Sequence, residues 1–322
     1  MRMPGIREWT RALVPVVFAA GTVSVVCAQT LAYVPNEGSA SLSVIDTATD
    51  RVIAEIPAGS KPRGVALSSD GSLAYVSDQP ASALVIVDLR ARKVKSSIAL
   101  GESPEGVSIS PDGRWVATAI EVANIVVLID ATTGREAARI STEGKNPEHA
   151  VFSPDSRWLY VSAEDASQVD VIDVAARKQV DRIAVGRRPR GIAFTPQGDR
   201  AYVACELDSA VYAIDVATRK VLARIAAGEF ANGVAMHPTG ERVYVSNGRG
   251  ASVSVIDTVK NEIVATIPVG QRPWNMALTP DGAKLYVANG RSGTVSVIDT
   301  RTQQKIADVA VGKLPWGVVM GR

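Results

Sequence analysis

The chain has 322 residues, of which 46% are hydrophobic and 21% are charged. These proportions are close to those of an ordinary globular domain, so they exclude wholesale disorder. A net charge of +2 argues against a strongly basic nucleic-acid-binding protein, and two cysteines and two histidines exclude a disulfide scaffold and a His-rich metal centre.

The chain begins with the pattern of an export signal. Three arginines in the first eleven residues supply positive charge, and residues 12–26 are apolar and uncharged but too few to span a membrane. Because Ala28 suits the position before a cleavage site, we expect residues 1–28 to be a signal peptide that is removed after export to the periplasm.

A lipid anchor on Cys27 is the alternative to this cleavage. The residue before it is Val26, whereas Gly, Ala or Ser usually precedes a lipidated cysteine. The expected mature chain, residues 29–322, would have equal numbers of basic and acidic residues. Its one cysteine would be Cys205, which we expect to be a buried, inert thiol.

Residues 29–322 are predicted to be a single domain in which one motif is repeated seven times. Ile-Asp or Val-Asp pairs recur every 42 or 43 residues and end at Asp46, Asp88, Asp130, Asp173, Asp215, Asp257 and Asp299. A tyrosine lies thirteen residues before each aspartate, except where Ala117 replaces it. A glycine recurs with the same period, at Gly59, Gly101, Gly144, Gly186, Gly228, Gly270 and Gly312.

Each repeat is predicted to contain four short strands. In the clearest repeat, tight turns at residues 279–282 and 299–302 and a loop at residues 289–293 separate apolar or alternating runs. The four runs are residues 275–278, 284–288, 294–298 and 306–311. Helical periodicity is absent, and four strands in about 40 residues are typical of a propeller blade.

The two ends of the repeat region predict how the ring closes. The expected mature chain starts at a second strand, residues 31–35, and ends with residues 317–320, which match a first strand. The sequence therefore predicts an all-β, seven-bladed β-propeller of four-stranded blades. The C-terminal strand would complete the N-terminal blade and leave no open sheet edge there.

The repeats resemble those of the YVTN-type β-propeller family. The resemblance rests on Tyr33-Val34-Pro35-Asn36, Tyr244-Val245-Ser246-Asn247 and Tyr286-Val287-Ala288-Asn289, each followed by a Val-Ile-Asp strand. Residues 186–191 and 311–319 are most similar to the PQQ-dependent catabolism-associated β-propellers. This resemblance implies a periplasmic accessory protein of a quinoprotein alcohol oxidation system, and it supplies no catalytic residues.

Loops between the fourth strand of one blade and the first strand of the next carry a Gly-x-x-Pro-x-Gly pattern. The residue after the proline position varies from repeat to repeat, so we predict that these residues form a binding surface around the channel mouth. They are Arg63, Glu105, Glu148, Arg190, Asn232, Trp274 and Trp316, and His149 lies beside Glu148. Two acids would thus lie between two arginines, with two tryptophans on the opposite side.

Loops between the second and third strands are expected on the same face, where Glu121 and Glu164 would join Glu105 and Glu148 in an acidic sector. One interpretation is that this sector forms inter-blade ion pairs, which contribute about 0–1 kcal/mol each when solvated. The other is that it binds Ca²⁺ or another cation, or a polar ligand whose apolar part lies on the tryptophans. His149 is expected to complete a hydrogen-bond network rather than to bind a metal.

The sequence contains no Cys-x-x-Cys-His and no Gly-x-Ser-x-Gly. We therefore predict a non-catalytic binding or accessory module with no cofactor of its own. Its partner would be a periplasmic protein, such as a quinoprotein dehydrogenase or its cytochrome, or a small ligand. The alternatives are a metal-assisted, lactonase-like hydrolase that uses the acidic sector, and a nucleic-acid- or surface-binding propeller.

Overall fold

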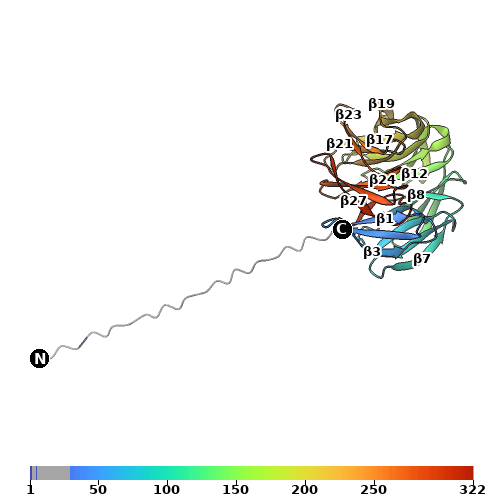
Figure 1. Ribbon diagram of the computed structural model, residues 1–322. Coiled ribbons are helices and arrows are strands. Elements are labelled where there is room, and N and C mark those ends of the chain that lie inside the picture. Colours follow the sequence, from blue (N-terminus) through green and yellow to red (C-terminus); the bar gives the residue numbers. More distant parts are fainter. Residues whose placement is uncertain (2–4, 6–29, 322) are drawn as a thin grey trace.

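The computed structural model describes Met1, Gly5 and residues 30–321. In this part of the chain, 28 strands form seven four-stranded antiparallel sheets, which are the blades of a propeller (Figure 1). The predicted all-β fold, with seven blades of four strands, is confirmed. The expected signal peptide, its cleavage site and Cys27 lie outside the described residues.

Blade 1 combines both ends of the chain. It contains β28 (Val319–Gly321), β1 (Leu31–Asn36), β2 (Ser41–Asp46) and β3 (Arg51–Pro57), in that order. Blade 2 contains β4 (Pro62–Leu67), β5 (Leu73–Asp78), β6 (Ala83–Asp88) and β7 (Lys93–Ala99), and blade 3 contains β8 (Pro104–Ile109), β9 (Trp115–Ile120), β10 (Ile125–Asp130) and β11 (Arg135–Ser141).

The remaining four blades follow in chain order. Blade 4 contains β12 (Pro147–Phe152), β13 (Trp158–Ala163), β14 (Gln168–Asp173) and β15 (Lys178–Ala184), and blade 5 contains β16 (Pro189–Phe194), β17 (Arg200–Cys205), β18 (Ala210–Asp215) and β19 (Lys220–Ala226). Blade 6 contains β20 (Ala231–Met236), β21 (Arg242–Asn247), β22 (Ser252–Asp257) and β23 (Glu262–Pro268). Blade 7 contains β24 (Pro273–Leu278), β25 (Lys284–Asn289), β26 (Thr294–Asp299) and β27 (Gln304–Ala310).

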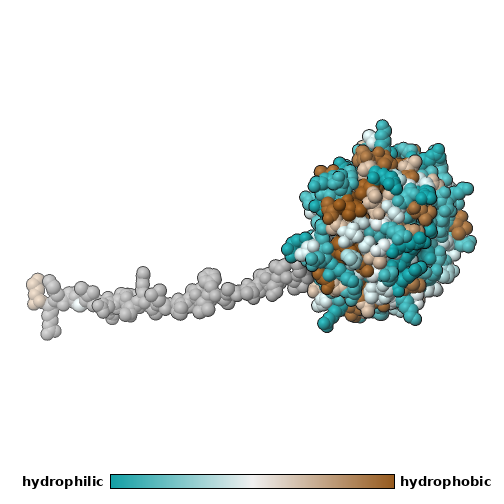
Figure 2. All heavy atoms as spheres, turned by 45° about the horizontal axis from the view of Figure 1, so that its top comes forward, coloured by the Kyte–Doolittle hydropathy of each residue, from teal (hydrophilic) through white to brown (hydrophobic). Residues whose placement is uncertain are grey.

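Burial follows the position of each strand in its blade. The second and third strands are buried along most of their length, because neighbouring blades cover both of their faces. The fourth strands are mostly exposed and carry charged residues, which blunts the outer edges of the sheets. The face drawn in Figure 2 accordingly mixes hydrophilic side chains with scattered hydrophobic ones.

The ring closes as the sequence predicted, with β28 beside β1. Tyr33 pairs with Val319 and Leu31 pairs with Gly321, one to two residues later than expected for a strand at residues 317–320. Apolar residues of blades 1 and 7 share one core cluster. Lys284 Nζ of blade 7 also contacts Asp50 Oδ2 of blade 1 at 2.7 Å, so the first and last blades are joined by apolar and polar contacts.

The innermost strands pack almost backbone to backbone around the channel. A Cβ atom on Gly106 would lie 2.8 Å from the carbonyl oxygen of Glu148, and one on Gly233 would lie 2.4 Å from that of Trp274. Such distances are too short for any larger residue, so glycine is required at these positions. His149 and Asn275 occupy the equivalent positions of blades 4 and 7, where the other whole repeats have glycine.

Helical structure in the described residues is limited to two 3₁₀ turns, η1 (Glu164–Ala166) and η2 (Glu206–Asp208). Both follow a second strand and therefore belong to the loops at the channel mouth. Within the described residues, no helix has the length and apolar character needed to cross a membrane.

Candidate functional site

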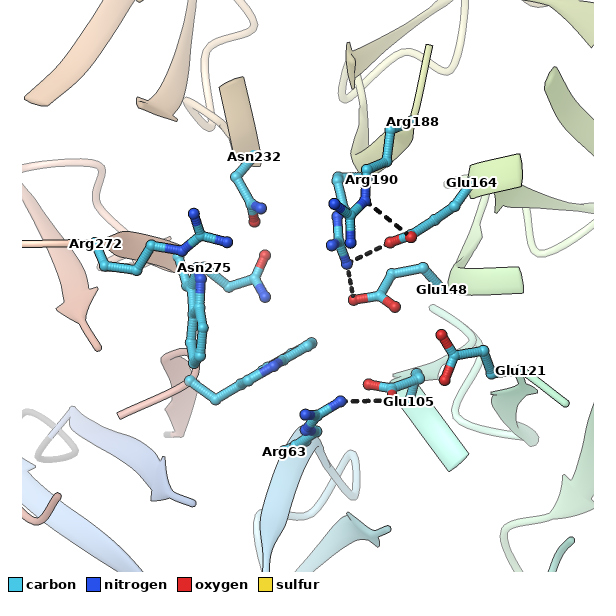
Figure 3. A pocket seen from close by; sticks show the side chains of 12 residues that line it. Arg63, Glu105, Glu121, Glu148, Glu164, Arg188, Arg190, Asn232, Arg272 and Asn275 are labelled. Carbon is cyan, nitrogen blue, oxygen red and sulfur yellow. Dashed lines mark hydrogen bonds and ion pairs between the residues drawn. The ribbon is translucent and has the colours of Figure 1, made fainter. Parts of the chain in front are cut away.

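One face of the channel opens into a cavity of about 190 Å³. Its walls come from the first residues of the first strands, from the loops before these strands and from the loops after the second strands, at the positions that the repeat pattern predicted. The lining residues are Arg63, Glu105, Glu121, Glu148, Glu164, Arg188, Arg190, Asn232, Arg272, Trp274, Asn275 and Trp316 (Figure 3). We call this space the mouth cavity.

Arg190, on β16, is the centre of the charge network in the mouth cavity. Its Nη1 contacts Glu148 Oε1 at 2.6 Å and also contacts Glu164 (Figure 3). Its Nε donates to Glu206 Oε2 at 3.1 Å. The Arg190 side chain is 12% exposed, and the three carboxylates are at most 7% exposed. One guanidinium therefore contacts three carboxylates, two from blade 4 and one from blade 5, in a nearly water-free setting.

Glu206, at the start of η2, is the most deeply buried of these acids. Arg188 Nε lies 3.3 Å from Glu206 Oε2, and Arg272 Nη2 lies 3.2 Å from Glu206 Oε1. The sequence places Glu206 in a second-to-third-strand loop at the channel mouth, together with Glu37, Glu121 and Glu164, but it was not counted in the acidic sector. Its signal was present, because an acid at the start of a second-to-third-strand loop recurs at Glu121 and Glu164.

A second ion-pair group lies at blades 1 to 3. Arg63 Nη1 contacts Glu105 Oε1 at 2.6 Å, and Arg63 Nε lies 3.4 Å from Glu37 Oε2. Gln79 donates to Glu105 Oε1 at 2.8 Å. The Oε2 atom of Glu105 is also buried but has no hydrogen-bond partner among the described residues.

Glu105, Glu121 and Glu148 form a compact group, the glutamate triad. One carboxylate oxygen from each lies within 4.8 Å of one from each of the others. Ser103 Oγ donates to Glu121 Oε2 at 2.6 Å. Glu164, which the sequence analysis placed in the same acidic sector, is instead paired with Arg188 and Arg190.

Burial and mutual repulsion shift the pKa values of these acids. Burial, followed by the charge of Glu148, raises the pKa of Glu105 to about 8. The same two causes raise the pKa of Glu164 to about 7. Burial also opposes ionisation of Glu148, but the charge of Arg190, together with that of Arg63 and a hydrogen bond from Arg190, helps to hold the pKa of Glu148 below its ordinary value. Glu148 therefore ionises first, and Glu105 retains a proton near neutral pH.

The tryptophans predicted at the mouth are neighbours in the structure. The Trp274 and Trp316 ring centroids are 6.5 Å apart, with an interplanar angle of 58°. Trp274 is half-buried, whereas Trp316 is only 9% exposed. Arg272 lies over the Trp274 ring at 5.9 Å from its centroid. The cavity thus has a carboxylate wall on blades 3 and 4 and an aromatic wall on blades 7 and 1.

His149 differs from the expectation that it completes a hydrogen-bond network. Its ring stacks on Trp316, with centroids 5.5 Å apart and an interplanar angle of 16°. Neither ring nitrogen has a hydrogen-bond partner among the described residues, and burial lowers the pKa of the imidazole. His149 does not line the mouth cavity. Its neutral ring instead packs against Trp316, which does line the cavity.

The structure brings the other predicted site residues together. All seven residues after the proline position, together with Glu121 and Glu164, line the mouth cavity. The expected ion pairs Arg63–Glu105 and Arg190–Glu148 are present, but they are buried rather than solvated. Asn275 was not predicted at the site. It replaces the glycine that five of the other six repeats have at this position, and this difference was its signal in the sequence.

Two family models match parts of the chain. The model for "Lactonase, 7-bladed beta-propeller" matches residues 173–309, and the model for "Cytochrome D1 heme domain" matches residues 26–149. Each covers less than half of the chain. Parts of the sequence are therefore similar to the lactonase and cytochrome D1 heme-domain families. Neither of these two models describes the narrower YVTN-type or PQQ-associated group. No curated protein matches this sequence.

Solved structures share the fold over most of the chain. Hydrazine synthase of Kuenenia stuttgartiensis is 25% identical, with a TM-score of 0.77 over 83% of this chain and 92% of that one. A functionally unknown protein from Desulfotomaculum acetoxidans is 18% identical, with a TM-score of 0.79 over 90% and 98%. The dihydro-heme d1 dehydrogenase NirN, in complex with DHE, is 18% identical, with a TM-score of 0.66 over 90% and 74%.

A haem is named in two of these matches, but the mouth cavity does not fit one. Its volume of about 190 Å³ is below the roughly 300–1,000 Å³ of ordinary ligand pockets. Of the chain's two histidines, His149 is stacked beneath the cavity, and His237 lies in a first-to-second-strand turn on the opposite face. Neither histidine therefore offers an axial ligand to the cavity.

Proposed function

We propose that this chain is a non-catalytic, exported binding propeller whose mouth cavity binds a small charged ligand. The proposal rests on one observation: the carboxylate wall and the aromatic wall face each other across one small cavity. The glutamate triad attracts positive charge, and Trp274 and Trp316 offer an aromatic surface to a cation or to an apolar group. A ligand of a few heavy atoms that carries a cationic group fits these walls.

The energetics of the mouth cavity support a functional origin for its charges. Buried ion pairs lose much of their Coulomb energy to desolvation and are often no more stabilising than apolar residues. Glycine and proline are constant in most of the mouth loops, and the variable side chains supply this charge pattern. A rigid scaffold that holds variable loops in place is a common arrangement for binding.

Native mass spectrometry can test this proposal on protein purified gently from the cells that make it. We expect additional mass on the wild-type chain and loss of that mass in Trp274→Ala, because Trp274 forms the accessible part of the aromatic wall. Trp158→Ala is the matched control, since Trp158 is a half-buried tryptophan that packs with Arg157 and lies outside the cavity. Additional mass that survives equally in both variants would contradict the proposed site.

Two finer parts of the proposal, export and service to an oxidation system, rest on the sequence. Export to the periplasm is supported by the pattern of residues 1–28. Service to a quinoprotein oxidation system stays a prediction that rests on the sequence resemblance alone. A bare wild-type mass, together with capture of a quinoprotein dehydrogenase or its cytochrome from the periplasm, would replace the small ligand by a protein partner.

A metal-assisted hydrolase is the second candidate function. The match of residues 173–309 to the lactonase model and the glutamate triad favour it. Its test is lactone hydrolysis by the purified chain, with and without a chelator. Hydrolysis that is lost with the chelator and also in Glu121→Gln would favour this candidate over the non-catalytic one.

A further inference from the structure

The spacing of the glutamate triad is that of ligands around one ion. Oxygens that coordinate Ca²⁺ lie about 2.3–2.6 Å from it, so two oxygens on opposite sides are about 5 Å apart. One oxygen from each of Glu105, Glu121 and Glu148 lies within 4.8 Å of the others. The three carboxylates could therefore contact one ion together. Glu105 lies on β8 and Glu148 on β12, and Glu121 directly follows β9, so the blades themselves set their spacing.

Neighbouring donors hold each member of the triad through one oxygen. Arg63 and Gln79 hold Glu105 through Oε1, at 2.6 and 2.8 Å. Arg190 contacts Glu148 Oε1 at 2.6 Å, and Ser103 donates to Glu121 Oε2 at 2.6 Å. Metal ligands in proteins are commonly oriented by such outer contacts, which fix the carboxylate and leave an oxygen for the ion.

A separate observation also indicates a ligand. Glu105 is 1% exposed, and its Oε2 has no hydrogen-bond partner among the described residues although Glu105 lines the mouth cavity. A buried acceptor without a partner costs about 1–3 kcal/mol, and more when it is charged. A cation beside Glu105 Oε2 would supply the missing partner and reduce the repulsion between the three carboxylates.

We propose that Glu105, Glu121 and Glu148 bind one divalent cation that prefers oxygen ligands, with Ca²⁺ as the best fit. The donors are carboxylates alone, and oxygen-only donor sets suit Ca²⁺, Mg²⁺ and Mn²⁺ rather than Zn²⁺ or Cu²⁺. Ca²⁺ tolerates the irregular geometry of three strands from adjacent blades, whereas Mg²⁺ demands an octahedron. The remaining coordination positions would face the mouth cavity, where water or the proposed ligand can complete them.

The two arginines in contact with the triad limit the expected affinity. Because the pKa of Glu105 is raised to about 8, the ion must displace its proton near neutral pH. Arg63 and Arg190 each contact one triad member and would offset two of the three negative charges that result. We expect a dissociation constant of about 10⁻⁴–10⁻³ M, which is the range of extracellular Ca²⁺ modules. This inference rests on the proposed function, because the ion would occupy the same cavity as the ligand.

The test is calorimetric titration of the EDTA-treated, buffer-exchanged full chain with CaCl₂. We expect one saturable site in the wild type and at least about a tenfold loss of affinity in Glu121→Gln. Glu121 is half-buried and held by one serine hydroxyl, so this variant should fold. Glu136→Gln is the control, because Glu136 is exposed on β11, pairs with Arg139 and lies outside the mouth cavity, and this variant should bind Ca²⁺ like the wild type.

Two results would overturn the cation proposal. One is the absence of saturable Ca²⁺ binding in the wild type, and the other is equal affinity in Glu121→Gln and Glu136→Gln. A titration with methylammonium separates an organic cation from a metal, since binding of methylammonium without Ca²⁺ binding would also overturn it. Retained mass that depends on Trp274 would then leave the proposed small-ligand function standing, so the two failures are distinguishable.

Discussion

Replacement of Arg190 by methionine should destabilise the protein far more than loss of a surface ion pair. Arg190 is the shared partner of Glu148, Glu164 and Glu206, whose side chains are 7%, 3% and 0% exposed. Removing one partner of a buried pair leaves an uncompensated charge and costs about 3–5 kcal/mol. Because three carboxylates lose this partner together, we expect Arg190→Met to reach the upper part of that range at pH 8.

Urea unfolding at equilibrium measures this loss, with Arg182→Met as the matched control. Arg182 contacts Glu143 at 2.8 Å, but the two side chains are 64% and 63% exposed, so the control should lose no more than about 1 kcal/mol. The double variant Arg190→Met/Glu148→Gln should recover part of the loss, because it removes the carboxylate that depends on Arg190 for its ion pair, whereas Glu206 keeps Arg188 and Arg272. Equal losses in the two single variants would show that water screens the mouth network and would refute the argument from burial.

Two further predictions concern ring closure and pH. Removing residues 319–322 deletes β28 and its pairing with β1. The free energy of unfolding, measured in urea, should therefore fall by about 2–4 kcal/mol. An unchanged value would mean that β28 does not close the ring. The folded pKa of Glu164, about 7, lies above its ordinary value of 4.5, so the stability that this difference contributes is present below about pH 4.5 and is lost as pH rises through 7. In EDTA, the stability of the wild type relative to Glu164→Gln should therefore fall between pH 5 and 8, and a rise over this range would contradict the assigned shift.

The fold could be predicted from the sequence because every repeat carries the same pattern of strands and turns. Tyrosine, Val-Asp or Ile-Asp pairs and glycine recur in phase, and their period and turn residues leave little freedom in the number of strands. Ring closure followed from the incomplete first repeat. The first strand of blade 1 was predicted early, at residues 317–320, because apolar composition alone does not specify the register that β28 adopts with β1.

The location of the candidate site was also predictable, but its internal pairing was not. A variable residue in an otherwise constant loop marked seven of the lining residues, and recurring acids after the second strands marked Glu121 and Glu164. Which carboxylates Arg190 contacts depends on distances across the channel, and these follow from blade tilt and side-chain direction rather than from the repeat. The stacking of His149 on Trp316 joins blades 4 and 1 in the same way, so a linear pattern could not reveal it.

A crystal structure of the full chain grown in millimolar MnCl₂ would test the central claim, that the mouth cavity is a cation-linked binding site, most directly. Mn²⁺ shares the oxygen preference of Ca²⁺ and can be located by its anomalous signal. The account predicts one anomalous peak in contact with Glu105 Oε2, Glu121 and Glu148, on the side of the cavity that faces Trp274. Ordered water hydrogen-bonded to these three glutamates, with no anomalous peak in the cavity, would contradict it.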